Sequence, residues 1–384
     1  MTQLFPAQTA PKTDAATRVF PNDFLFGVAT AAYQIEGAAH EDGRTDSIWD
    51  AFARVPGAVV DGHNGDVACD HYHRYESDVK LMADLGLQTY RFSTSWSRVQ
   101  PDGGQVNAKG LDFYSRLVDQ LLENNIKPWL TLYHWDLPQA LEEKGGWTNR
   151  DTAYLFAEYA ENVHAALGDR VDAWTTLNEP WCSSFLSYIG GEHAPGRQEP
   201  EAGLAAGHHL LLAHGLGVTR LRELDPSLQL GITLNLTVAD PVDPENPADV
   251  DAARRIDGQF NRFFTDPIFR GEYPADVRAD LAHIDWEKYI QPGDLEIISA
   301  PIDALGVNYY HGEALSASPA VREMSTAAPS ERPKRSPFPA PEGIFWHLRD
   351  LPLTAMDWEV QPEGLTRRCV ASRTSTPAQP SSST

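Results

Sequence analysis

Short apolar runs alternate along the chain with longer segments whose apolar residues recur at helical spacing. Segment 110–125 shows the helical pattern, with Phe113, Leu117 and Leu121 on one face. The apolar runs predict strands at 24–34, 88–96, 127–135, 171–179, 229–236 and 302–310, and the periodic segments predict helices at 77–86, 110–125, 151–168 and 203–224. Because the strand runs are continuously apolar, they are typical of parallel strands buried on both faces.

Strand–helix steps of this kind build either a doubly wound sheet or a barrel. A doubly wound sheet normally carries a Gly-rich phosphate turn after its first strand, whereas this chain has AAYQIEG there. We therefore predict an α/β fold, an incomplete (β/α)8 barrel with about six units present and strands seven and eight missing. The polar residues at the predicted strand ends should then meet at one mouth: Gln34, Arg91, Ser95, His134, Asn178, Glu179, Asn235, Asn308 and Tyr310.

The charge and the cysteines limit the partners and the compartment. The 384 residues carry a net charge of -23, which argues against nucleic acid and anionic membranes as partners. Three cysteines far apart form no disulfide framework, the N-terminus has no apolar signal region, and no run approaches the roughly 18 apolar residues of a membrane span. We expect a cytoplasmic protein.

The two ends of the chain differ in composition from the rest. Residues 1–17 form a polar stretch that we predict to be a disordered arm, and 18–365 should form the barrel. Residues 366–384, TRRCVASRTSTPAQPSSST, have no acidic residue and are rich in Ser, Thr and Pro. We predict that this tail is disordered and lies outside the barrel domain.

The candidate chemistry centres on Glu179, which ends the apolar run RVDAWTTLNEP. The Asn-Glu-Pro triplet is weak evidence alone. In chain order, however, the sequence contains FLFGVATAAYQIEGA, DHYHRYESDVKLMADLGLQTYRFSTSWSRV, LYHWDLPQAL, TLNEPW and LGVNYY. Together these segments resemble the family 1 glycoside hydrolases of the β-glucosidase type.

The resemblance implies a role for each matching residue. Glu179 matches the general acid/base, which protonates the glycosidic oxygen as the bond breaks. Asn178 matches the residue that binds the sugar 2-hydroxyl. The other implied substrate-binding residues are Gln34, His134, Trp135, Asn308, Tyr310 and, as a wall for the leaving group, Trp181. Arg91 and Tyr310, with Asn308 beside them, match residues that orient a nucleophilic carboxylate. No metal and no cofactor are implied.

The second carboxylate is not found. In the family the nucleophile is a Glu in an I/V-T-E-N-G setting at the end of strand seven, about 5–5.5 Å from the acid. The sequence contains no T-E-N-G, and Glu359 and Glu363 lie in a loop that precedes this strand in the family. We therefore expect hydrolysis by this chain to be absent or severely impaired.

Other interpretations remain open. The chain could be a non-catalytic remnant that binds sugar, or a cellulase-type barrel endoglycosidase, although TAAYQIEG and YHWDLP argue against the latter. The expected ligands are β-glucosides or short β-linked oligosaccharides, with galactosides and fucosides not distinguished and the oligomeric state undetermined. Cys69, His71 and His73 suggest a metal site, but only Cys69 and His73 would share a helix face, so packing is the better interpretation.

Overall fold

The computed structural model describes residues 19–320 and 332–375, so the predicted arm 1–17 lies outside the described residues. Its main sheet contains β1 (Gly27–Ala29), β2 (Thr89–Ser93), β3 (Lys127–Tyr133), β4 (Ala173–Asn178), β5 (Gln229–Asn235) and β7 (Ala304–Asn308). The longer helices are α3 (His71–Asp84), α5 (Ala108–Glu123), α7 (Asp151–Leu167), α8 (Pro200–Leu224), α9 (Pro247–Asp257), α10 (Phe263–Arg270) and α13 (Glu363–Ser375).

Shorter elements connect these. The short α-helices are α1 (Ala32–Ile35), α2 (Ile48–Ala53), α4 (Trp96–Val99), α6 (Gln139–Glu142), α11 (Ala275–Asp280) and α12 (Asp294–Ile298). The 3-10 helices are η1 (Val60–Gly62), η2 (Pro101–Gly103), η3 (Gly146–Thr148) and η6 (Glu287–Tyr289), and the π-helical segments are η4 (Cys182–Gly190) and η5 (Gly258–Arg262).

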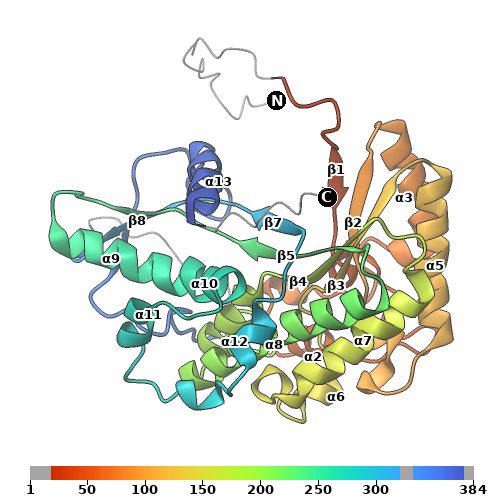
Figure 1. The fold of residues 1–384 in the computed structure, drawn as a ribbon, viewed down its shortest axis with the longest axis horizontal. Coiled ribbons are helices and arrows are strands. Elements are labelled where there is room, and N and C mark those ends of the chain that lie inside the picture. Colours follow the sequence, from red (N-terminus) through yellow and green to blue (C-terminus); the bar gives the residue numbers. More distant parts are fainter. Residues whose placement is uncertain (1–18, 321–331, 376–384) are drawn as a thin grey trace.

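The main sheet is parallel throughout and follows chain order. Its six strands are arranged β1-β2-β3-β4-β5-β7, and each neighbouring pair runs in the same direction. The sheet is open, with β1 and β7 at its edges (Figure 1). Strands β3 to β5 are almost wholly buried, whereas every residue of β1 is exposed. This arrangement confirms the predicted parallel α/β sheet with about six strand–helix units.

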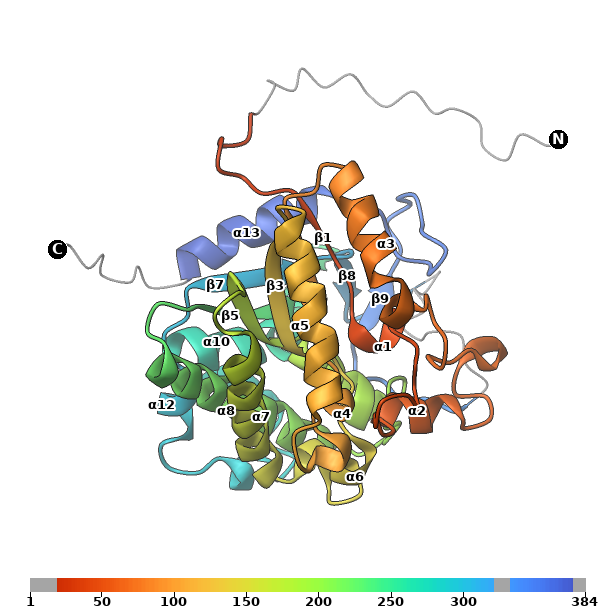
Figure 2. The ribbon, with the colours of Figure 1, turned by 90° about the vertical axis from the view of Figure 1, so that its right-hand side faces the viewer.

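Helices pack on the outer face of the sheet through their apolar residues. Helix α5 buries Phe113, Leu117 and Leu121, as its spacing predicts. It packs against α3 on one side and α7 on the other, and α7 packs against α8. Figure 2 shows α3 and α5 side by side on this face. The carboxyl ends of the strands thereby lie together at one end of the sheet, where the predicted site residues are found.

The chain also forms a second, smaller sheet of three strands. It contains β6 (Ala239–Pro241), β8 (Glu313–Ser316) and β9 (Phe345–His347), with β8 parallel to β6 and antiparallel to β9. The sequence does not predict this sheet, because strands of three or four residues are too short to show a regular hydrophobic pattern. It matters for function because residues of β8 and β9 line the cavity described below.

The structure corrects two predictions. The predicted strand 24–34 is a strand only at Gly27–Ala29, and Ala32–Ile35 forms α1 instead. The predicted disorder of 366–384 is wrong as far as Ser375, because α13 extends to that residue; 376–384 lie outside the described residues. Among its described side chains, ion pairs attach this helix, with Arg367 bonded to Asp240 and Arg368 3.4 Å from Asp257.

Two kinds of feature are absent from the described residues. Within 19–320 and 332–375, no helix combines the length and the apolar character needed to cross a bilayer. The same ranges bring together no group of three His, Cys, Asp or Glu side chains suited to a metal ion. His71 and His73 are instead bonded to carboxylates, His71 to Asp78 at 2.7 Å and His73 to Asp70 at 2.6 Å.

Candidate active site

Glu179 follows the last residue of β4 and is held there by the neighbouring strand. Its backbone N–H donates to the Thr233 carbonyl of β5 at 2.8 Å, and its side chain is buried. Its φ of 51° lies in the left-handed region, as does that of Trp135 just after β3, at 79°. Non-glycine residues in this region cost roughly 1–3 kcal/mol and gather at functional sites. Two such residues at the ends of neighbouring strands therefore indicate a functional site at the carboxyl ends of β3 and β4.

Both oxygens of the Glu179 carboxyl have partners. The Asn308 amide and the Tyr310 hydroxyl, the latter at 3.4 Å, donate to Oε1. The Cys182 thiol donates to Oε2 at 3.2 Å, and the Asn235 amide lies 3.6 Å from the Cys182 sulfur. Burial, with Glu179 beside it, raises the pKa of Cys182 well above its usual range, so the sulfur keeps the proton that it donates.

Asn178 connects the acid to three other strands. Its Oδ1 accepts from Arg91 Nη2 at 2.5 Å and from the Asn308 amide at 3.2 Å. Its Nδ2 donates to His134 Nε2 at 3.2 Å, and its carbonyl accepts from Trp135 Nε1 at 2.9 Å. Residues from β2, β4 and β7, with two that follow β3, thus form one hydrogen-bonded group.

Burial sets the charge of the groups around this carboxyl. Burial, together with a smaller effect of Arg91, lowers the pKa of His134 to about 3, so His134 is neutral and its Nε2 accepts from Asn178. Burial raises the pKa of Tyr310, with Glu179 adding to the rise, so its hydroxyl stays a donor. Burial lowers the pKa of Arg91, against the pull of Glu179 and Tyr310.

A cavity of about 490 Å³ opens over Glu179. Its lining combines carboxyl groups with flat aromatic walls. The aromatic residues are Trp135, Trp181, Phe260, Tyr310, Phe338, Trp346 and Trp358. Aromatic faces suit the C–H side of a sugar ring, while the carboxyls and amides can bind its hydroxyls.

Comparison with known proteins gives this site its context. The sequence matches the model of glycosyl hydrolase family 1 over residues 16–374. The chain belongs to this family. The predicted barrel boundary at residue 365 therefore falls inside the matched range.

Individual relatives of family 1 agree with this assignment. The β-glucosidase of Agrobacterium sp. is 47% identical over 359 residues, which cover 93% of this chain and 74% of the relative. The bifunctional β-D-glucosidase/β-D-fucosidase of Bifidobacterium breve is 45% identical over 376 residues, covering 95% and 77%. The crystal structure of the psychrophilic β-glucosidase BglU from Micrococcus antarcticus superposes with a TM-score of 0.90 at 58% identity, covering 93% and 77%.

These relatives make the chain a glycoside hydrolase of the β-glucosidase type. Its open six-stranded sheet is a partial (β/α)8 barrel, as predicted. The cellulase-type alternative loses its support, because the family and the named relatives are of the β-glucosidase type.

The structure brings together most of the residues that the family resemblance indicated. Besides Glu179, the hydrogen-bonded group contains Arg91, His134, Trp135, Asn178, Asn308 and Tyr310. Trp181 lines the cavity, where its ring packs on Phe260 with centroids 4.3 Å apart. Gln34 lies apart: it is exposed in α1 and is absent from the cavity lining among the described residues.

One neighbour of the acid has no predicted role in the sequence analysis. Cys182 donates to Glu179, and its position three residues later, one helical turn, could have indicated this. Asn235, predicted at the mouth, bonds Cys182 and lines the cavity. Glu313, which also lines it, gave no sequence signal.

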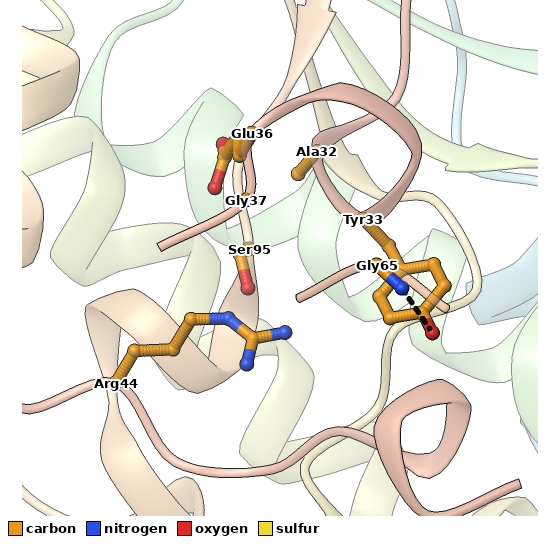
Figure 3. Close-up of a pocket in the computed structure, with 7 residues that line it drawn as sticks. All are labelled: Ala32, Tyr33, Glu36, Gly37, Arg44, Gly65 and Ser95. Atoms are coloured by element: carbon orange, nitrogen blue, oxygen red, sulfur yellow. Dashed lines mark hydrogen bonds between the residues drawn. The ribbon is translucent and has the colours of Figure 1, made fainter. Parts of the chain in front are cut away.

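Three other buried carboxylates, those of Glu36, Asp50 and Glu359, are paired with arginines. Figure 3 shows a narrow polar crevice near α1, where the Tyr33 hydroxyl accepts from the Gly65 N–H at 3.2 Å. Glu36 in this crevice is bonded to Arg98 at 2.9 Å and Arg44 to Asp50 at 2.8 Å, so the charges are already paired. Glu359 is likewise bonded to Arg349 at 2.7 Å.

Proposed function

We propose that the cavity is a β-glucosidase site in which Glu179 is the general acid/base. The observation that carries this proposal is the buried Glu179 carboxyl, which lines a 490 Å³ cavity and is held by donors from other elements. A glycosidic oxygen is a poor leaving group, so a fixed carboxylic acid beside it is what the reaction needs. The names of the relatives support β-D-glucosides as substrates, and the bifunctional relative supports β-D-fucosides as well.

Sugar recognition in this proposal falls to the polar groups at the strand ends. Asn178 binds the 2-hydroxyl, and His134 supplies a neutral ring nitrogen for another hydroxyl. Trp135 and Trp181 offer apolar faces. Gln34 would have to turn toward the sugar to take part, since its side chain is exposed.

We further propose that these 384 residues alone do not complete the reaction. Retention requires a second carboxylate on the opposite face of the sugar, about 5–5.5 Å from the acid. Arg91, Asn308 and Tyr310, which the resemblance places around that nucleophile, are here bonded to Asn178 and Glu179 instead. Glu359 is paired with Arg349, and neither Glu359 nor Glu363 lines the cavity among the described residues.

The charge and the cysteines support the remaining parts of the proposal. A net charge of -23 disfavours nucleic acids and anionic membranes as partners. Cys69, Cys182 and Cys369 are free thiols, which fits a reducing, cytoplasmic compartment.

Three measurements test the proposal. The purified 384-residue chain and its Glu179→Gln variant should release p-nitrophenol from p-nitrophenyl β-D-glucoside equally slowly, at the background rate. Intact-mass analysis after incubation with 2,4-dinitrophenyl 2-deoxy-2-fluoro-β-D-glucoside should show no glycosyl adduct. Titration calorimetry with glucose should show binding that His134→Ala weakens.

The outcomes separate the two halves of the proposal. Turnover that depends on Glu179, or a trapped adduct, would show that a nucleophile is present and would overturn the claim of inactivity. Absence of glucose binding would count against the site itself. The β-glucosidase BglU of Micrococcus antarcticus is the positive control in each assay.

A further inference from the structure

Glu313 places a second buried carboxyl in the cavity of Glu179. It is the first residue of β8, where its N–H donates to the Val238 carbonyl at 2.7 Å, and its side chain is 7% exposed. Its Oε1 lies 3.5 Å from His311 Nδ1, while its buried Oε2 has no hydrogen-bond partner. A buried polar atom without a partner costs roughly 1–3 kcal/mol, so its presence calls for a reason.

The other carboxyls that line the cavity differ from Glu313. Both oxygens of Glu179 accept hydrogen bonds, and Glu192 lies 3.9 Å from Lys334 Nζ. Asp357 is exposed to water. Among the described residues that line this cavity, Glu313 is therefore the buried carboxyl with an oxygen that has no hydrogen-bond partner.

Aromatic groups with unpartnered N–H donors share this part of the cavity. The register of β8 and β9 places Trp346 opposite Leu315, so Trp346 and Glu313 lie on the same face of the small sheet. The buried indole nitrogens of Trp346 and Trp181 have no hydrogen-bond partner. Glu313, Trp346 and Trp181 thus line one cavity, and each carries a buried polar atom without a hydrogen-bond partner.

The charge state of Glu313 suits a neutral, hydroxyl-bearing ligand. Burial raises the pKa of Glu313 to about 7; Arg349 opposes this rise and Glu359 adds to it. The Arg349 guanidinium is bonded to Glu359 at 2.7 Å and to Asp240 at 3.1 Å, so its charge is compensated elsewhere. Near neutral pH the carboxyl can donate or accept, and a hydroxyl group can match either form.

A nucleophilic role for Glu313 fits the structure less well. Arg91, Asn308 and Tyr310 bond Asn178 and Glu179, and none of them is bonded to Glu313. A carboxyl that is protonated for much of the time is also a weak nucleophile. Binding is the role that its surroundings support.

We propose that Glu313 is a specificity-determining residue that binds a hydroxyl group of the aglycone, so that the cavity favours a second sugar unit over an apolar aglycone of the same size. This inference rests on the proposed β-glucosidase site and adds the chemistry of its leaving-group side. Trp346 and Trp181 would supply the remaining donors and an apolar face for the second ring.

A matched pair of sulfur-linked glucosides tests the proposal, because neither is readily hydrolysed. Thiocellobiose carries a hydroxylated second ring, and cyclohexyl 1-thio-β-D-glucoside carries a ring of similar size without hydroxyls. Titration calorimetry should show that the chain binds thiocellobiose more tightly. In Glu313→Leu this preference should fall by roughly tenfold, the value of a hydrogen bond to a carboxyl group. Glu313→Gln, which can still donate and accept, should keep most of it.

Controls separate this inference from the proposed function. Asp357→Asn removes an exposed carboxyl at the same cavity and should leave the preference unchanged. Glu313→Leu should melt at or above the temperature of the unaltered chain, because it removes a buried carboxyl oxygen without a partner. An equal preference in the unaltered chain and Glu313→Leu would overturn the inference alone. Failure of both glucosides to bind would overturn the inference and the proposed function together.

Discussion

Asn308 is the side chain on which the geometry of the acid depends most directly. Its single amide nitrogen donates to both Glu179 Oε1 and Asn178 Oδ1, the latter at 3.2 Å. Asn308→Ala should therefore lower the free energy of unfolding by about 1–3 kcal/mol, because two buried acceptors lose a donor. Asn308→Asp should cost more, since it places a second carboxylate against Glu179. Urea unfolding followed by fluorescence measures both.

The matched control for Asn308 is a surface amide. Gln105 is exposed, so Gln105→Ala should change the free energy of unfolding by no more than about 0.5 kcal/mol. If Asn308→Ala were as mild as this control, the amide bridge between Asn178 and Glu179 would have no energetic significance.

Single residues were predictable from the sequence where a motif fixed both their identity and their place at a strand end. Glu179, Asn178 and Asn308 are of this kind, and they meet as expected. Gln34 could not be placed, because its position depends on how the chain turns after a strand of three residues. Glu313 could not be found, because its burial depends on a sheet formed by segments distant in sequence.

Strands and helices of the main sheet were predictable because they are long and continuously patterned. Strand β5 was expected at 229–236 and spans Gln229–Asn235, and α7 was expected at 151–168 and spans Asp151–Leu167. The first strand and α13 were not, since β1 is exposed throughout and the described side chains of α13 are mostly exposed. A hydrophobic pattern in the sequence indicates which residues are buried. It therefore does not predict elements that are held mainly by ion pairs or that lie exposed at the edge of a sheet.

The elements around β1 are joined by one buried ion pair. Arg98 of α4 and Glu36 after α1 lie 2.9 Å apart with side chains 0% and 5% exposed, and Tyr114 of α5 donates to the same carboxyl at 2.6 Å. Arg98→Met should lower the free energy of unfolding by roughly 3–5 kcal/mol, because Glu36 would be left buried without its cation. Chemical denaturation measures the loss.

An exposed pair provides the comparison for Arg98. Lys80 and Asp84 lie 2.9 Å apart on α3 with side chains 71% and 61% exposed. Lys80→Met should cost at most about 0.5 kcal/mol, since water screens such pairs. Equal effects of the two substitutions would contradict the view that the buried pair joins α1, α4 and α5.

Acid should destabilise the folded chain as a unit, because several histidines are buried in their neutral form. Burial lowers the pKa of His134 and His214 to about 3 and that of His193 and His209 to about 4. An unfolded histidine has a pKa of about 6.5, so between pH 6.5 and 4 the unfolded state binds about four protons that the folded state does not. Stability therefore falls as the pH falls through this window.

Buried carboxyls oppose this effect without cancelling it. Burial raises the pKa of Asp136 and Glu313 to about 7, so in the same window the folded state holds about two protons that the unfolded state has lost. Weaker shifts act in both directions, since burial lowers the pKa of His311 and raises those of Glu142 and Asp266. In this window the unfolded state therefore binds about two more protons than the folded state.

A difference of two bound protons lowers the free energy of unfolding by roughly 1–3 kcal/mol per pH unit on going from pH 6.5 to 5. Urea midpoints measured at half-unit intervals give this slope. The buried His214 of α8 shares a hydrogen bond of 2.7 Å with Thr176 of β4. His214→Gln should reduce the slope by about one proton, whatever its effect on the free energy of unfolding at pH 7. His283→Gln, at an exposed position, should leave the slope unchanged. A slope that is flat, or that His214→Gln does not alter, would mean that the buried histidines take up protons without unfolding the barrel.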